Sequence, residues 1–261
     1  MNPIFLNVTI PVYNEERTLA SSIEKISAFL KSNCPQPYEI VIAENGSTDK
    51  TFRIARQLEQ ELPNVRALHV NEKGRGRAIK SAWQQSNAEI LSYMDVDLST
   101  ELVAFPPLID ALVNRGFDLA IGSRLLDPDL TRRGLKRETI SRGYNLLVRA
   151  VFRTRFSDAQ CGFKAITRRA AAELLPLIED NAWFMDTELL VLAEKLGYRI
   201  FDLPVRWTDD PDSRVQLWST ALADIKGLMR VRRNLASGRY SSRHQLTPAT
   251  AERGVGTALQ S

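Results

Sequence analysis

The chain has 261 residues, of which 44% are hydrophobic, and a formal net charge of +4. The length indicates one large α/β domain with a buried core, and the charge is too small to indicate nucleic acid as a partner by itself. With only two cysteines, Cys34 and Cys161, and two histidines, the sequence argues against a disulfide framework and against a His/Cys zinc centre.

The N-terminus and the apolar segments indicate a protein without a membrane span. The chain starts MNPIF, with no basic region and no small-residue cleavage pattern, so we expect no signal peptide. No window approaches the ~18 uninterrupted apolar residues that a spanning helix needs. We therefore expect a soluble or peripheral protein in the cytoplasm, where cysteines stay reduced.

The first half of the chain alternates strand-like and helix-like segments. Strands are predicted at residues 5–10, 39–44, 65–70, 89–97 and 118–123, with amphipathic helices between them. This alternation predicts an α/β fold with right-handed crossovers and a mostly parallel sheet that has helices on both faces. In such a sheet ligands bind at the carboxyl ends of the strands, so the polar residues after each strand are site candidates.

The second half is predicted as a basic loop over residues 125–136, a helix over about 138–153, a strand within 160–167, two helices, a strand within 198–207 and a last helix over about 217–235. Between Arg124 and Arg155 there are nine Lys or Arg residues and three acids. Such a patch needs an anionic partner, which could be a phosphate, a lipid surface or nucleic acid. Residues 237–261 lose periodicity and are predicted to be a disordered tail.

Asp95 and Asp97 carry the clearest chemical signal. They are separated by one residue where an apolar strand ends, and residues i and i+2 of a strand share a face. Both carboxylates can therefore converge on one hard cation, Mg²⁺ or Mn²⁺, and a diphosphate can supply further oxygen ligands. A solvated turn at the end of the strand is the alternative interpretation.

Several further motifs follow one another in order. IPVYNE, ENGSTD, NEKGRGRAI, MDVDL and GSR closely resemble the motifs of family 2 glycosyltransferases, which have the GT-A nucleotide-sugar-binding fold. The segments DAQCGFKAI, FMDTELL and LPVRW followed by DSRV resemble the branch that loads sugars onto dolichyl or polyprenyl phosphates. The resemblance covers about residues 5–232. It implies one domain over residues 1–236, with a nucleotide-sugar-binding half (1–124) and an acceptor-binding half (125–236).

The resemblance implies a nucleotide-sugar site at the ends of the first strands. Its members would be Pro11, Tyr13, Glu15, Glu44, Asn45, Gly46, Lys73, Gly74, Asp95 and Arg214. Glu15 would accept a hydrogen bond from the ribose or the base, and Lys73 or Arg77 would meet the diphosphate. Glycines such as Gly74 let the backbone approach a ligand. Asn45 replaces an acid that the family usually has, and since an amide both donates and accepts, UDP and GDP both stay open.

The resemblance also implies an acceptor site and catalytic acids. The residues expected to hold a lipid phosphate are Arg124, Arg133, Arg142 and Gln160. Guanidinium groups suit this role because they match phosphate geometry. The candidates for catalysis are Asp97, Asp158, Asp186 and Glu188. Cys161 is interpreted as a packed residue because no histidine motif accompanies it.

The implied activity is an inverting transfer of a sugar from a UDP- or GDP-linked donor to a polyprenyl or dolichyl phosphate, with Mg²⁺ or Mn²⁺ held by Asp95 and Asp97. A phosphate nucleophile needs no dedicated base. A transferase with a soluble sugar or small alcohol as acceptor, which would need a carboxylate base, is the first alternative. A sugar nucleotidyltransferase is the second, although VYNEE stands where such enzymes have a glycine-rich loop. A non-catalytic nucleotide- or lipid-binding module is the third. None of these hypotheses includes nucleic acid as a partner.

The last predicted helix has a broad apolar face flanked by basic residues. The apolar residues are Leu217, Trp218, Ala221, Ile225, Leu228 and Leu235, and the basic ones are Lys226, Arg230 and Arg233. One interpretation is a helix that lies in the lipid interface on the inner face of the membrane, where a polyprenyl phosphate would be met. The other is packing on the protein's own domain.

Overall fold

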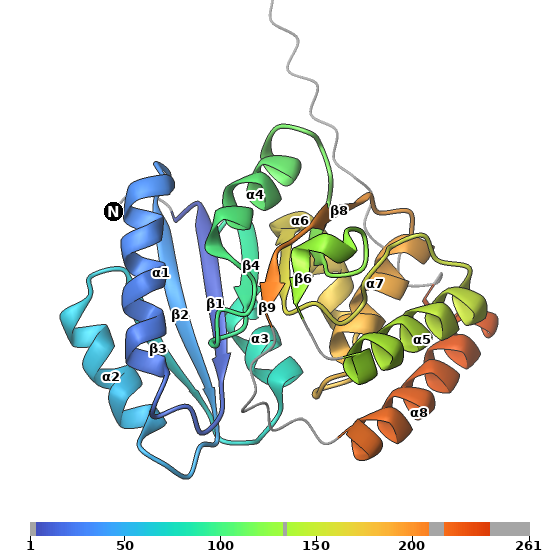
Figure 1. Cartoon of the computed structure of the whole chain (residues 1–261), viewed down its shortest axis with the longest axis horizontal. Helices are drawn as coiled ribbons and strands as arrows, with labels where there is room; N and C mark the ends of the chain where they lie inside the picture. The colour runs from blue at the N-terminus through green and yellow to red at the C-terminus, as the bar shows by residue number, and fades with distance from the viewer. Residues whose placement is uncertain (1–3, 133–134, 209–216, 241–261) are drawn as a thin grey trace, which may run out of the picture.

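The computed structural model describes residues 4–132, 135–208 and 217–240. These residues form an α/β domain whose central seven-stranded sheet has the order β3-β2-β1-β4-β7-β5-β8 (Figure 1). Its strands are β1 (Leu6–Val12), β2 (Tyr38–Asn45), β3 (Val65–Val70), β4 (Ile90–Met94), β5 (Leu119–Ser123), β7 (Phe163–Thr167) and β8 (Ile200–Pro204). The helices are α1 (Leu19–Asn33), α2 (Thr51–Glu61), α3 (Arg75–Gln84), α4 (Phe105–Val113), α5 (Leu135–Phe152), α6 (Arg168–Leu174), α7 (Met185–Lys195) and α8 (Leu217–Ala236).

β7 is the exception to the parallel arrangement of the sheet. It pairs antiparallel with β4 on one side and with β5 on the other. The pairs β1–β2, β1–β4, β2–β3 and β5–β8 are all parallel. The strand predicted within residues 160–167 begins only at Phe163, because a turn precedes it. The sheet is therefore mixed but mostly parallel, which confirms the predicted fold class.

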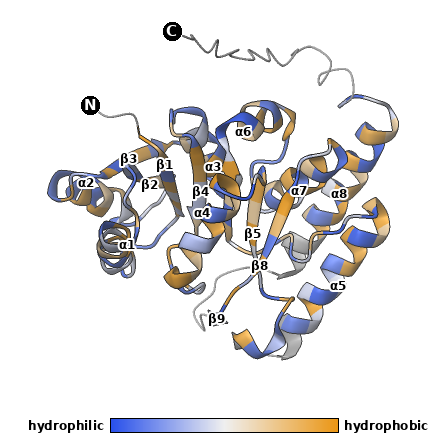
Figure 2. Ribbon diagram, turned by 90° about the horizontal axis from the view of Figure 1, so that it is seen from above, coloured by the Kyte–Doolittle hydropathy of each residue, from blue (hydrophilic) through white to orange (hydrophobic). Residues whose placement is uncertain are grey.

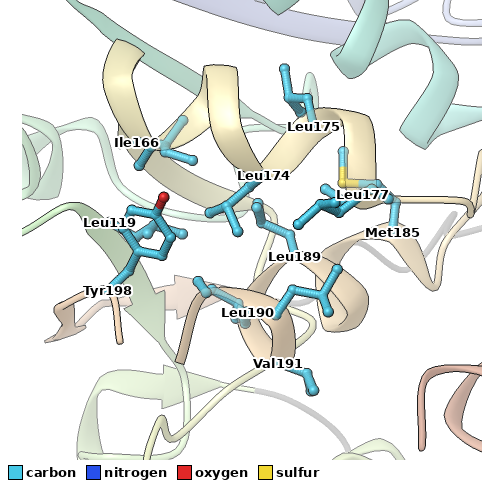
Figure 3. Close-up of a cluster of buried hydrophobic side chains, with 14 of the residues drawn as sticks. Leu119, Ile166, Leu174, Leu175, Leu177, Met185, Leu189, Leu190, Val191 and Tyr198 are labelled. Atoms are coloured by element: carbon cyan, nitrogen blue, oxygen red, sulfur yellow. The ribbon is translucent and has the colours of Figure 1, made fainter. Parts of the chain in front are cut away.

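The two faces of the sheet carry separate hydrophobic clusters. Helices α1, α2 and α4 cover one face, where Ile23 and Leu108 are buried. Helices α3, α6 and α7, with parts of α5 and α8, cover the other face, where Trp83 and Leu174 are buried. Figure 3 shows side chains of α6 and α7 meeting those of the sheet in this second cluster. Helices on both faces explain why β1 is mostly apolar and is buried along its whole length, including its polar residues Asn7 and Thr9.

α7 is enclosed on nearly every side. Each residue from Met185 to Ala193 is buried, including Asp186 and Glu188. A helix that is buried all round belongs to the core. Since a buried carboxylate is costly without a partner, both acids of α7 must be compensated inside the protein.

A short pair of strands in the second half of the chain lies near the loop that follows β4. β6 (Thr131–Arg132) pairs in parallel with β9 (Trp207–Thr208). The amide of Thr208 donates to the carbonyl of Ser99 at 2.9 Å. The segment after β8 therefore lies against the loop after β4, which carries Asp97.

α5 and α8 lie side by side at one edge of the molecule (Figures 1 and 2). The apolar face predicted for the last helix is divided, since Leu228 is buried in the core while Ile225 is 45% exposed. Leu217, Trp218 and Ala221 fall outside the described side chains. In the part of the chain that the structure describes, no helix is long and apolar enough to cross a bilayer.

The end of the chain differs from the prediction at its boundary. Residues 237–240, assigned to the tail from the sequence, form turns after α8. Tyr240 is buried, and its hydroxyl accepts a hydrogen bond from Asn234 Nδ2 at 3.2 Å. The domain therefore extends past residue 236. The rest of the predicted tail, 241–261, lies outside the described residues.

Candidate active site

The loops after β1 and β2 are tied together at the carboxyl edge of the sheet. Asn14 has a left-handed φ of 57°, which Asn tolerates better than most residues. Its Oδ1 accepts from the amide of Thr48 at 2.8 Å, and its own amide donates to Ser47 Oγ at 3.0 Å. The amide of Glu15 donates to Thr51 Oγ1 at 2.7 Å. These bonds hold Glu15 at the edge where the nucleotide was predicted to bind.

Asn45 is a buried connector between three loops. Its Nδ2 donates to the carbonyl of Val12 at 2.8 Å, and its Oδ1 accepts from the amide of Gly74 at 3.0 Å. A carboxylate could not donate to Val12, which gives the amide at this position a structural reason. Because both ends of the side chain are satisfied by backbone, Asn45 shapes the nucleotide edge from inside instead of presenting its amide to a base.

Glu44 is fully buried at the end of β2 and contacts the ring nitrogen Nδ1 of His69 on the neighbouring β3. It also accepts a hydrogen bond from the amide of Ser47, which closes the turn through Gly46. Gly46 has a left-handed φ of 73°, and a Cβ there would lie 3.3 Å from Asn71 O. Glu44 therefore supports this loop from within, and its carboxylate contacts His69.

Tyr13 and Lys73 meet at the outer part of this edge. The ammonium group of Lys73 lies 4.0 Å from the centroid of the Tyr13 ring, a cation–π distance. Pro11 is buried in β1, opposite Ala43 of β2. Of these predicted nucleotide residues, Tyr13 and Lys73 are accessible to a ligand, whereas Pro11 acts from within the sheet.

The glycines at the start of α3 make room for protein atoms. A Cβ on Gly74 would lie 2.4 Å from Asn181 O, and one on Gly76 would lie 2.8 Å from Ala182 O. The amides of Gly76 and Arg77 donate to the carbonyls of Ala182 and Asn181 at 3.2 and 3.0 Å. The close backbone approach that Gly74 was expected to offer a ligand is therefore made to the segment before α7. A glycine pattern alone cannot distinguish these two uses.

Asp95 and Asp97 follow β4, as predicted, but in different surroundings. Asp95 rests on Gly162: a Cβ on that glycine would lie 1.6 Å from Asp95 Oδ2, and the amide of Asp95 donates to the Gly162 carbonyl at 3.1 Å. Asp97 is exposed and accepts a hydrogen bond from the amide of Ser99 at 2.9 Å. Gly162 thus orients the carboxylate of Asp95, and the carboxylate of Asp97 closes the turn that follows.

This donor set fits a divalent metal ion. The side chain of Asp95 is 41% exposed, so a ligand can reach its carboxylate although Gly162 packs against one oxygen. Carboxylate oxygens are the donors that Mg²⁺ and Mn²⁺ prefer. Among the described residues no group of three or more His, Cys, Asp or Glu could enclose a metal ion. A metal here would therefore take its remaining ligands from a bound diphosphate and from water.

Arg75, the first residue of α3, links Asp95 to Asp186 of α7. Its Nη2 lies 2.8 Å from Asp95 Oδ1, and its Nη1 lies 2.6 Å from Asp186 Oδ2. Asp186 also accepts a hydrogen bond from the Tyr93 hydroxyl and lies 3.3 Å from the ammonium group of Lys164. Burial acts to raise the pKa of Asp186, but Lys164 and Arg75 outweigh it and hold this pKa below its usual value. Asp186 is therefore kept ionised within a network of charges.

Arg124 and Asp158 form a second buried ion pair. The guanidinium Nε and Nη2 donate to the two carboxylate oxygens at 2.7 and 2.9 Å, and the Asp158 side chain is fully buried. Burial acts to raise the pKa of Asp158, but Arg124 lowers it to about 2. Arg124, predicted to hold a lipid phosphate, and Asp158, predicted to act in catalysis, therefore neutralise each other in this structure.

Gln160 and Arg142 lie in the acceptor half at different depths. Gln160 Nε2 donates to Asp224 Oδ2 of α8 at 3.3 Å. Asp224 is only 3% exposed, and burial raises its pKa to about 7. Arg142 is exposed on α5, where it pairs with Glu138 one turn earlier. Gln160 thus connects the segment before β7 to a buried acid, whereas Arg142 is accessible to an anionic partner.

Glu188 is not brought to the Asp95 cluster. Its Oε2 lies 2.7 Å from Arg230 Nη2 and accepts from the amide of Asp180 at 2.8 Å. Residues i and i+2 of a helix are about 200° apart, so Asp186 and Glu188 leave α7 in different directions. Of these two candidates for catalysis, Asp186 lies in the network with Asp95, whereas Glu188 joins α7 to α8 through Arg230. Arg133 and Arg214, two further predicted site residues, lie outside the described residues.

Three residues of this site were missed from the sequence, although each left a signal. Arg75 stands between the two glycines of the third motif and begins α3. Tyr93 lies on β4 two residues before Asp95, which directly follows the strand, and both side chains contact Arg75. Asp224 interrupts the apolar stripe of the last helix, where an acid needs a partner inside the protein.

The mostly parallel sheet, with paired acids directly after β4 and polar loops at its carboxyl edge, is the arrangement of the GT-A glycosyltransferase fold. Solved structures share this fold. Glucosyl-3-phosphoglycerate synthase from Mycobacterium tuberculosis, in complex with Mn²⁺, UDP and phosphoglyceric acid, has a TM-score of 0.62 at 17% identity, over 94% of this chain and 80% of that one. The mannosyltransferase PcManGT from Pyrobaculum calidifontis, with GDP-Man and Mn²⁺, has a TM-score of 0.56 at 15% identity, over 94% and 65%.

The chain belongs to glycosyl transferase family 2, whose family model matches residues 7–175. It is 36% identical over 225 residues to glycosyltransferase AglD of Haloferax volcanii, a match that covers 85% of this chain and 35% of AglD. It is 30% identical over 242 residues to the dolichyl-phosphate beta-glucosyltransferase of Dictyostelium discoideum, over 88% of this chain and 74% of that protein. The chain thus spans about a third of the length of AglD.

Proposed function

We propose that this enzyme transfers a sugar, with inversion at the anomeric carbon, from a nucleoside-diphosphate sugar to a polyprenyl or dolichyl phosphate at a membrane surface. The similarity to dolichyl-phosphate beta-glucosyltransferases carries the proposal. The match to the Dictyostelium protein covers 88% of the chain, so it extends past residue 175, where the family model ends, into the half expected to bind the acceptor.

The surface of α5 and α8 supports an acceptor with an apolar tail. Leu146 on α5 is 68% exposed, and Met229 and Leu222 on α8 are 60% and 58% exposed. Arg142 and Lys226 are exposed on the same two helices. Single exposed leucines are ordinary, but several large apolar side chains with basic neighbours on adjacent helices suit a lipid interface.

The paired acids support a metal-dependent departure of the nucleoside diphosphate. Asp95 and Asp97 would hold Mg²⁺ or Mn²⁺, which would neutralise the charge that develops on the leaving group. The backbone at Gly162 keeps the Asp95 carboxylate in place. Lys73 and Tyr13 would border the nucleotide, with Glu15 on the same edge.

The ionised states of Asp158 and Asp186 favour a phosphate acceptor. In the transfer an acceptor phosphate oxygen forms a bond to the anomeric carbon while the bond to the diphosphate oxygen breaks. A phosphate dianion carries no proton to lose, so no base is needed. Asp158 and Asp186 are both held ionised with lowered pKa values, and carboxylates of this kind are weak bases. Their contribution would be to position Arg124 and Arg75.

One observation favours a second candidate, a transferase that acts on a hydroxyl of a soluble acceptor. The pKa of Asp224 is raised to about 7, near the optimum for a general base, and its carboxylate contacts Gln160 in the segment before β7. Under this alternative Asp224 would take the proton of the acceptor hydroxyl.

A product analysis distinguishes the two candidates. The full chain is incubated with UDP- and GDP-linked sugars and Mn²⁺, in separate reactions with polyprenyl phosphate, polyprenol without phosphate, and soluble sugars or small alcohols, and products are identified by mass spectrometry. We expect a glycosyl phospholipid only with polyprenyl phosphate, an activity that survives Asp224→Asn. A product on a soluble acceptor that disappears with Asp224→Asn, without any glycosyl phospholipid, would reject the lipid acceptor.

A further inference from the structure

Arg75 closes a compact network of four charges. It contacts Asp95 and Asp186 through different nitrogens, and Lys164 contacts Asp186 from the other side. The side chains of Arg75, Asp186 and Lys164 are 10%, 4% and 2% exposed, while Asp95 is the member open to a ligand. Two positive and two negative groups therefore balance one another where a metal ion would bind.

The guanidinium of Arg75 is held in this position on all sides. It lies 4.8 Å from the centroid of the Tyr93 ring and 5.2 Å from that of Trp183. Burial acts against its charge, and the ion pairs with Asp95 and Asp186 compensate for the lost hydration. Because Arg75 begins α3 directly after Gly74, whose backbone is tied to Asn45, its side chain leaves from a fixed point. This arginine is built into the site.

Both oxygens of Asp95 have contacts, although its side chain is 41% exposed. Oδ1 accepts from Arg75 Nη2 at 2.8 Å and from Nε at 3.3 Å. Oδ2 lies against Gly162, where even a Cβ would not fit. A metal ion that approached the free protein would therefore compete with the guanidinium for Asp95, and Asp97 is the one carboxylate of the assigned metal site that lies outside the balanced network. Like charges at such short range disfavour each other strongly when partly buried.

We propose that Arg75 holds the place of the metal ion at Asp95 until a nucleoside diphosphate arrives, so that metal and nucleotide bind together. The diphosphate brings negative charges that balance the metal ion. Once the metal takes Asp95, Arg75 keeps its contact with Asp186, and its Nε and Nη2 become available to the diphosphate oxygens. Arg75 thus acts as a positioning residue that sets the order of binding. This inference rests on the metal site assigned to Asp95 and Asp97 under the proposed function.

Mn²⁺ binding without turnover tests the inference. The free Mn²⁺ signal in electron paramagnetic resonance is titrated with the full chain, first alone and then with saturating UDP or GDP, whichever the chain binds. We expect wild type to bind Mn²⁺ weakly alone and Arg75→Gln to bind it about tenfold more tightly or better, because one charge that competes with the metal is removed. The nucleotide should then increase Mn²⁺ affinity more in wild type than in Arg75→Gln, since the coupling is reciprocal.

Arg56→Gln is the matched control. Arg56 lies on α2 and pairs with Glu59 of the same helix, so this variant changes the net charge by the same amount without touching Asp95. Its Mn²⁺ affinity without nucleotide should stay within about twofold of wild type, as expected for a screened charge at the surface. Equal tightening in Arg56→Gln and Arg75→Gln would mean a general charge effect and would overturn the inference.

Two more variants distinguish an effect on folding from an effect on Mn²⁺ binding. If Arg75→Gln unfolds by circular dichroism because Asp186 loses its partner, Arg75→Gln with Asp186→Asn replaces it in the same titration. Asp95→Asn should lose Mn²⁺ binding in both conditions. Wild type that binds Mn²⁺ equally with and without nucleotide contradicts the role of Arg75 but leaves the proposed transferase intact. Wild type that binds no Mn²⁺ even with nucleotide rejects the metal site itself, and the inference with it.

Discussion

The carboxylate of Asp95 rests directly on the backbone of Gly162: a Cβ on this glycine would lie 1.6 Å from Asp95 Oδ2. Gly162 belongs to the segment before β7, so a residue of the predicted acceptor half supports the acid of the predicted nucleotide half. A contact with backbone positions a carboxylate more firmly than a contact with a flexible side chain does. The orientation of Asp95 therefore depends on the absence of a side chain at residue 162.

Replacing this glycine should displace Asp95. In Gly162→Ala the carboxylate has to move, and we expect kcat to fall by about 100-fold, the usual cost of misplacing a catalytic group by about 1 Å. Gly143→Ala is the control, because Gly143 is exposed on α5 and a Cβ there would meet nothing within 4 Å. That variant should keep its turnover and gain up to about 1 kcal/mol in unfolding free energy. Steady-state kinetics and urea unfolding measure both. Normal kcat in Gly162→Ala would contradict the assignment of Asp95.

Asp97 should matter for turnover and little for folding. It is exposed and its assigned task is to bind the metal ion, so Asp97→Asn should abolish Mn²⁺-dependent sugar transfer while the circular dichroism spectrum and the melting temperature stay those of wild type. Excess EDTA should have the same effect on wild type. Full activity of Asp97→Asn, or of wild type in EDTA, would remove the metal from the mechanism.

The Arg124–Asp158 pair should be needed for stability. Arg124→Ala leaves a fully buried carboxylate without its partner, and removing one member of such a pair costs about 3–5 kcal/mol of unfolding free energy. Arg155→Ala breaks a pair with Glu194 in which the arginine side chain is 91% exposed, so it should cost less than about 1 kcal/mol. Urea unfolding at pH 7 compares the two. Equal losses of unfolding free energy in the two variants would mean that the buried Arg124–Asp158 pair does not stabilise the fold.

The same pair should give an acid dependence. The pKa of Asp158 is about 2 in the folded protein, below that of an aspartate in an unfolded chain, about 3.9. The stabilisation is therefore fully present above about pH 4 and is lost as the pH falls towards 2. A urea series from pH 6 to pH 2 should show a steeper fall for wild type than for a folded variant in which both charges are removed, Arg124→Leu with Asp158→Leu.

The contribution of Asp224 to stability should change with pH in the opposite direction. Its folded pKa of about 7 lies above the unfolded value, so the folded protein binds more protons between about pH 4 and pH 7, and stability falls as the pH rises through this range. Asp224→Asn should therefore be more stable than wild type at pH 8, by an amount on the order of 1–3 kcal/mol, and this advantage should shrink at pH 5. Asp129→Asn, an exposed aspartate, is the control. A pH-independent effect of Asp224→Asn would contradict the raised pKa.

Binding to liposomes tests the surface of α5 and α8. We expect Leu146→Gln with Met229→Gln to reduce flotation with vesicles that contain anionic lipid, because both side chains would lose their apolar contact. Binding of wild type should also weaken as salt rises, since each basic residue near anionic lipid contributes about 1 kcal/mol. Val103→Gln is the control: Val103 is 68% exposed but lies outside these helices. Wild type that does not float, or floats equally in all variants, leaves this surface without a lipid role.

The elements and the position of the paired acids could be predicted because their signals are local. Strands and helices differ in period, and Asp95 and Asp97 stand two residues apart at the end of an apolar run. The direction of β7 could not be predicted in this way, since a short apolar strand carries no sign of whether its neighbours run parallel or antiparallel to it.

The pairing of the charged residues could not be predicted from the sequence. Arg75 and Asp186 are 111 residues apart in sequence, and Arg124 and Asp158 are 34 apart. Their pairing follows from how the sheet and α7 pack, not from any local pattern. Residues that looked like free binding groups are therefore used inside the protein.

The place of β5 in the sheet has a consequence for the protein during its synthesis. β5 ends at Ser123 and is buried along its whole length, but its neighbours in the sheet are β7 and β8, which end at Thr167 and Pro204. A ribosome that has just released LAIGS has made a strand that is buried in the folded protein but still has both edges open, and open edges of this kind are sites of aggregation. β1 to β4 can pair with one another on the nascent chain before this point. β5 has no neighbouring strand until about forty more residues have been made. The interval in translation in which aggregation is favoured therefore falls between the synthesis of the two halves of the chain.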